Sequence, residues 1–120
     1  NTRVALVGFS HGGLVSFKVA LVRRDLRAVA LLAPAFGQGL LAEAAKDAGQ
    51  LSAPLLVMVE ESDAPPILRG VAAIEKATRA HGKPLRLIRH NRGGGHELFY
   101  NVGYWWEDLA AFLREHLGNR

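Results

Sequence analysis

Residues 3–13 read Arg3-Val4-Ala5-Leu6-Val7-Gly8-Phe9-Ser10-His11-Gly12-Gly13. An apolar run of strand length ends there in a serine flanked by glycines, in the pattern Gly-x-Ser-x-Gly formed by Gly8, Ser10 and Gly12. A strand that turns sharply into a helix leaves little room beside the serine, so glycine is expected on both sides of it. The serine itself is expected in a strained backbone conformation. The pattern predicts that Ser10 is an exposed nucleophile.

Apolar runs and amphipathic stretches alternate along the rest of the chain. We expect strands at residues 3–7, 28–32, 54–59 and 85–90, and helices at 12–24, 39–48, 66–81 and 104–117. The strands are apolar throughout, which is typical of parallel strands covered on both faces. The order βαβαβαβα predicts one α/β domain over residues 1–120, with four parallel strands in sequential order. Right-handed crossovers would place the first three helices on one face and the last helix on the other.

The composition narrows the classes of partner. The net charge is +4, but the basic residues are scattered, so we expect no nucleic-acid partner. The apolar runs are too short for a membrane span, and we expect no membrane partner. Cysteine is absent, which excludes disulfides and thiolate metal sites. We expect a cytoplasmic location. The chain lacks an initiating Met and begins almost on a strand, so we expect a piece trimmed from a longer protein.

A nucleophilic serine needs an imidazole to take its proton and usually a carboxylate to orient that imidazole. In parallel α/β sheets these groups gather in loops beyond the carboxyl ends of the strands. His96 follows three glycines after the fourth expected strand, a placement that suits a general base. His90 ends that strand, and we expect it to be structural. A metal site built from His90, His96 and Asp63 would fit no standard ligand spacing, so no metal or other cofactor is expected.

The acid is sought after the third expected strand. Asp63 is favoured because a short carboxylate in a turn before two prolines suits a fixed orienting role. Glu61 is the alternative. Glu60 is a further alternative, although it continues the strand and is expected to face solvent or a cation. The leading hypothesis is that Ser10 attacks an ester carbonyl while His96 acts as base and then as acid.

The motifs together resemble the α/β-hydrolase superfamily. Gly-Phe-Ser-His-Gly-Gly resembles its nucleophile elbow, and the order Ser10, Asp63, His96 matches the order of its triad. Within the superfamily the chain looks most like the branch of dienelactone hydrolases and prolyl-oligopeptidase-like esterases. Dienelactone hydrolases carry cysteine as the nucleophile, whereas this chain has Ser10, which argues for ester substrates. The resemblance implies that the backbone N–H of His11 stabilises the oxyanion.

The resemblance covers only the second half of the family fold. The family's first half contains the loop that donates the second oxyanion N–H, and losing one such donor typically lowers turnover by about 10²–10³-fold. The first half also contains the strand beside the one that runs here from Arg3 to Val7. That strand becomes an unpaired apolar edge, and such edges recruit other strands. We therefore expect a homo-oligomer, or a complementary half-domain, joined through the edge from Arg3 to Val7.

Two other functional classes compete with an active esterase. The chain could be a catalytically weak or silent half-domain that needs a partner half or self-association to complete its sheet and oxyanion site. It could also bind an anion, because a glycine-rich turn at a helix start presents backbone N–H groups to phosphate. The phosphate-binding P-loop requires a lysine after the second glycine, and this chain has none there. The acyl group and the alcohol of an ester substrate are not specified by any motif.

Overall fold

The described residues fold around one parallel sheet. The structure is a computed structural model, and it describes residues 4–34, 40–90 and 105–118. Four strands pair in parallel in the order β1-β2-β3-β4. They are β1 (Val4–Phe9), β2 (Leu26–Leu32), β3 (Leu55–Glu60) and β4 (Leu85–His90). The predicted α/β class and the sequential strand order are confirmed, and the limits of the first three strands shift by one to two residues.

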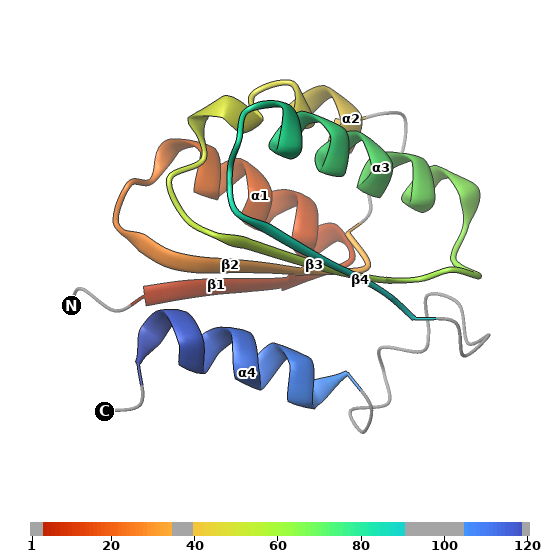
Figure 1. The fold of residues 1–120 in the computed structure, drawn as a ribbon. Coiled ribbons are helices and arrows are strands. Elements are labelled where there is room, and N and C mark those ends of the chain that lie inside the picture. The colour runs from red at the N-terminus through yellow and green to blue at the C-terminus, as the bar shows by residue number, and fades with distance from the viewer. Residues whose placement is uncertain (1–3, 35–39, 91–104, 119–120) are drawn as a thin grey trace.

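The helices lie on both faces of the sheet, as expected from right-handed crossovers. Figure 1 shows α1, α2 and α3 on one face and α4 on the other. They are α1 (His11–Val22), α2 (Leu40–Ala45), α3 (Pro65–Ala80) and α4 (Trp106–Leu117). The helix expected at residues 39–48 is shorter than predicted, because it ends at Ala45 and a 3₁₀ turn, η1 (Ala48–Gln50), follows.

Two cores result from this layering. Side chains of β3 alternate between them: Leu55, Val57 and Val59 join the core under α1, α2 and α3, whereas Leu56 and Met58 join the core over α4. The α4 core also contains Leu109 and Phe112 from that helix. A sheet with apolar side chains on both faces explains why the strands read as continuous apolar runs.

The last helix is held to the sheet by packing and by charge. Phe112 is 1% exposed, and the Arg86 guanidinium from β4 lies 5.6 Å from the centre of its ring. Arg86 also donates a hydrogen bond of 2.7 Å to Glu115. These contacts join α4 to the β4 edge, while α4 also packs across β1 and β2.

No helix among residues 4–34, 40–90 and 105–118 is long and apolar enough to cross a membrane.

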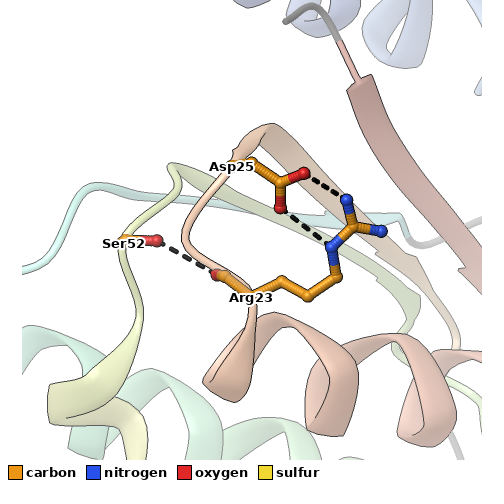
Figure 2. Close-up of polar contacts among 3 residues, drawn as sticks. All are labelled: Arg23, Asp25 and Ser52. Atoms are coloured by element: carbon orange, nitrogen blue, oxygen red, sulfur yellow. Dashed lines mark hydrogen bonds and ion pairs between the residues drawn. The ribbon is translucent and has the colours of Figure 1, made fainter. Parts of the chain in front are cut away.

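The connection from α1 to β2 is closed by polar contacts at the amino end of the sheet (Figure 2). The Arg23 guanidinium pairs with both oxygens of Asp25, and the Ser52 hydroxyl donates to the Arg23 carbonyl oxygen at 3.3 Å. Hydrogen bonding from Arg23 holds the pKa of Asp25 below its usual range. Both side chains are about half exposed, so the pair shapes this turn more than it stabilises the fold. The carboxyl ends of the strands lie at the opposite edge.

Candidate active site

Ser10 is the single residue between β1 and α1, and its backbone is strained. It has φ 58° and ψ −120°, in the region that favours glycine. A non-glycine residue in such a conformation costs about 1–3 kcal/mol. Two hydrogen bonds hold it there: the Ser10 N–H donates to the Leu32 carbonyl at 2.9 Å, and the Ser10 carbonyl accepts from the Gly13 N–H at 2.8 Å. The side chain makes no capping hydrogen bond to α1.

Glycine is needed at Gly8 and Gly13 because the chain passes close to itself there. A Cβ at Gly8 would overlap the Gly12 carbonyl oxygen and lie 2.5 Å from the Ser16 Oγ atom. A Cβ at Gly13 would lie 2.8 Å from the Cβ of Pro34, in the segment after β2. At Gly12, no atom of the described part of the chain lies within 4 Å of such a Cβ. The expected crowding is thus found at Gly8, whereas on the other side of the serine it falls on Gly13.

The end of the neighbouring strand has a similar backbone feature. Ala33 follows β2 with φ 48°, is fully buried, and donates its N–H to the Met58 carbonyl at 2.8 Å. Phe9 and Leu32 are register partners, so Ser10 and Ala33, the two described non-glycine residues with positive φ, directly follow paired positions. Sequence reasoning missed this feature, because alanine has no preference for a positive φ. The signal that bears on it is Pro34, which disfavours the right-handed helical region for Ala33.

Asp63 lies in a tight turn between β3 and α3. Its side chain is only 4% exposed, and one carboxylate oxygen accepts the Ala64 N–H at 2.7 Å at the start of α3. Its own N–H donates to the Glu60 carbonyl at 2.9 Å. These contacts fix the carboxylate at the carboxyl end of β3, the edge where the sequence predicts an orienting acid.

The other two acids of this segment differ sharply from each other. Glu61 is exposed and lines an open depression of about 320 Å³ on the α3 face, together with Val59, Leu68, Val71 and Arg89. Glu60 was expected to face solvent or a cation; the solvent-exposed alternative is wrong, because its exposed fraction is 0%. Its carboxylate accepts hydrogen bonds from Ser62 within the same turn. Sequence reasoning did not identify Ser62 as a contact of this carboxylate.

The remaining predicted site residues are histidines. His96 lies outside the described residues, and its distances to Ser10 and Asp63 are therefore not given by the structure. His11 is the first residue of α1 and is exposed. His90 ends β4 as the register partner of Glu60, and its carbonyl accepts the Glu61 N–H at 2.8 Å. Within the described ranges, no group of three or more histidine, aspartate and glutamate side chains is arranged to hold a metal ion.

Comparison with known proteins gives a family match and a set of structures with the same fold. A sequence model of the dienelactone hydrolase family matches residues 1–101. A search of curated proteins found no match.

Three of the similar solved structures illustrate the likeness. A Klebsiella pneumoniae protein assigned as a dienelactone hydrolase has a TM-score of 0.77 at 20% identity, over 95% of this chain and 52% of its own. Dipeptidyl peptidase 4 from Porphyromonas gingivalis has a TM-score of 0.82 at 18% identity, over 97% of this chain and 20% of its own. An esterase from Pyrococcus furiosus has a TM-score of 0.77 at 13% identity, over 98% and 55%. At such identities the likeness concerns the fold, and this chain spans about half or less of each protein.

Proposed function

The chain belongs to the dienelactone hydrolase family, and from that premise we propose that it is a serine hydrolase that cleaves carboxylic esters through Ser10, His96 and Asp63. The observation that carries the proposal is the backbone of Ser10, with φ 58° and ψ −120° at a strand-to-helix turn. This conformation is costly and serves no helix-capping contact of the side chain. Strain of this kind is concentrated at functional sites, where it holds a reactive group in place.

The spacing of the strands supports a role for a bridging imidazole. Ser10 follows β1 and Asp63 follows β3, with β2 between them. Neighbouring strands are about 4.8 Å apart, so the two strand ends are separated by about 10 Å. A serine hydroxyl and a carboxylate cannot meet across that gap, whereas an imidazole ring with a hydrogen bond on each nitrogen spans it. His96 follows β4 in the sequence, next to β3 in the sheet, and is the histidine proposed for this place.

In the proposed reaction, His96 takes the proton of the Ser10 hydroxyl while the Ser10 oxygen attacks the ester carbonyl. The backbone N–H of His11, at the start of α1, would stabilise the negative charge on the carbonyl oxygen. His96 then gives the proton to the leaving alkoxide, which departs as an alcohol, and an acyl-enzyme on Ser10 remains. Water, activated by the same imidazole, hydrolyses the acyl-enzyme to a carboxylic acid and restores Ser10. Asp63 keeps the imidazole in the required tautomer throughout.

A fluorophosphonate probe tests the proposed nucleophile directly. We expect the folded chain to be labelled at Ser10, and Ser10→Ala to lose both labelling and hydrolysis of 4-nitrophenyl acetate. Ser16→Ala is the matched control, because Ser16 lies within α1 and is expected to leave labelling unchanged. A folded chain in which Ser10 stays unlabelled while ester is hydrolysed would contradict the proposal.

A second candidate is a weakly active half-domain completed by another polypeptide segment, and one observation favours it. Within the described part of the chain, β1 lies at an edge of the sheet, with Val7 46% exposed. Exposed apolar edges recruit other strands. The partner would be a second copy or a complementary half that pairs along β1.

Light scattering and an esterase assay together distinguish a second copy from a complementary half. Self-association that Val7→Lys weakens would favour a second copy. A chain that stays monomeric at high concentration, and whose esterase activity rises by orders of magnitude when a family first half is added, would favour the complementary half. A monomer with unchanged activity would exclude both.

A further inference from the structure

Glu60 places a fully buried carboxylate at the end of β3. Its exposed fraction is 0%. Side chains alternate along β3, and Leu56 and Met58 belong to the core over α4, so Glu60 follows them on that face. Burying an ionisable group costs several kcal/mol unless hydrogen bonds compensate for the lost hydration. The position of Glu60 therefore depends on the hydrogen bonds that it accepts.

Hydrogen bonds within the described residues reach Glu60 from the turn that carries Asp63. The Oε1 atom of Glu60 accepts the Ser62 N–H at 3.3 Å and the Ser62 hydroxyl at 3.2 Å. The main-chain oxygen of Glu60 accepts the Asp63 N–H at 2.9 Å. One buried residue thus accepts hydrogen bonds through its side chain and its backbone from two of the next three residues. The turn is folded back onto Glu60.

The same turn is fixed at its outer ends. The Glu61 N–H donates to the His90 carbonyl at 2.8 Å, which ties the turn to β4. The Asp63 carboxylate accepts the Ala64 N–H at 2.7 Å, at the first turn of α3. Ser62 lies between these anchors and is exposed, so its contacts with Glu60 connect the middle of the turn to the protein interior.

We propose that Glu60 is a positioning residue that aims the Asp63 carboxylate by holding Ser62. The inference rests on the proposed function, in which Asp63 orients the catalytic imidazole. Glu60 does not act on the substrate in this scheme. A displacement of about 1 Å in a catalytic group can cost about 10²-fold in rate, so a turn held from inside the core has a direct effect on turnover.

Two substitutions in the full chain separate the role of the acceptor oxygen from the role of the charge. Glu60→Leu removes the acceptor oxygens and replaces a buried ionisable side chain with an apolar one of similar size. We expect kcat on 4-nitrophenyl acetate to fall by about 10²-fold, with KM and the melting temperature little changed. Glu60→Gln retains an oxygen that can accept from Ser62, and we expect it to keep kcat within about fivefold of the wild type.

Val57→Ala is the matched control, because Val57 is buried in the same strand on the opposite face. We expect it to lower the melting temperature and leave kcat unchanged. If Glu60→Leu lost kcat only because the fold became less stable, Val57→Ala would lose kcat as well. The inference is wrong if Glu60→Leu keeps kcat within about twofold of the wild type. It is also wrong if Glu60→Gln loses as much activity as Glu60→Leu.

Failure of the proposed function has a different signature. If wild-type hydrolysis persists in Ser10→Ala, or if no hydrolysis is measured, the serine mechanism fails for this chain. Amide hydrogen exchange then still tests whether Glu60 holds the turn. We expect Glu60→Leu to speed exchange at Ser62 and Asp63 by about tenfold or more relative to Val57→Ala. Equal exchange rates in the two variants would overturn the inference without any measurement of activity.

Discussion

Replacing Ser10 by glycine should stabilise the fold while it removes the proposed nucleophile. The reason is the backbone angle φ 58°, which glycine adopts without strain. The comparison is made with Ser10→Ala, because both variants lack the hydroxyl and differ only in the cost of this conformation. For alanine the strain costs about 2 kcal/mol. Glycine avoids that strain but loses about 1 kcal/mol more conformational entropy on folding.

The difference leaves Ser10→Gly more stable than Ser10→Ala by about 1 kcal/mol, or about 4 °C in melting temperature for a domain of this size. Urea denaturation and thermal unfolding monitored by circular dichroism measure both quantities. The control is the same pair of substitutions at Ser16 inside α1, where glycine should be less stable than alanine by about 1 kcal/mol. The sign of the difference should therefore reverse between the two sites. If Ser10→Gly is less stable than Ser10→Ala, the strained elbow is refuted.

Three further substitutions test contacts around the site and at the edge of the sheet. Gly13→Ala should destabilise the fold by about 1–3 kcal/mol in urea unfolding, because its Cβ would lie 2.8 Å from the Cβ of Pro34. Gly12→Ala is the control and should have little effect on stability. Similar losses in both variants would contradict the crowding assigned to Gly13. The pKa of Glu75 lies below its usual range, chiefly because Arg89 donates a hydrogen bond to its carboxylate. This carboxylate therefore stabilises the fold above the unfolded-state pKa. The contribution is lost as pH falls through the lower folded-state pKa. Glu75→Gln should therefore lower the free energy of unfolding by less than about 1 kcal/mol at pH 7 and by less still in acid. A loss that grows in acid would contradict a stabilising ion pair between Glu75 and Arg89, whose side chains lie 3.0 Å apart.

The sheet could be predicted from the sequence because its signal is carried by whole runs of residues. In β3, five apolar residues from Leu55 to Val59 read as a strand covered on both faces, and the structure divides them between the two cores. The placement of α4 on the face opposite α1 follows from the handedness of parallel crossovers and needs no knowledge of side-chain contacts. The position of Asp63 at a strand end follows from the same topology.

Individual side chains at the site were harder to predict, because their environment is set by residues distant in sequence. Glu60 follows the apolar run of β3 and was expected to face solvent or a cation, but its side chain is fully buried. The positive φ of Ala33 is a property of the turn and not of alanine. At Gly13 the crowding comes from Pro34, which is adjacent only after β1 and β2 have paired. The role of Gly13 therefore could not be inferred from its neighbours in the chain.

The bond between the Ser10 N–H and the Leu32 carbonyl has a consequence for the order of folding during synthesis. The two residues belong to different strand ends, so the bond forms only when β2 has been made and has paired with β1. Until then the bond to Leu32 does not oppose relaxation of Ser10 to an ordinary backbone angle. A nascent chain whose Leu32 is still inside the ribosome therefore lacks the hydrogen bond that holds Ser10 in its strained conformation. The strained serine is a product of long-range folding, and a short peptide with the same glycines would not reproduce it.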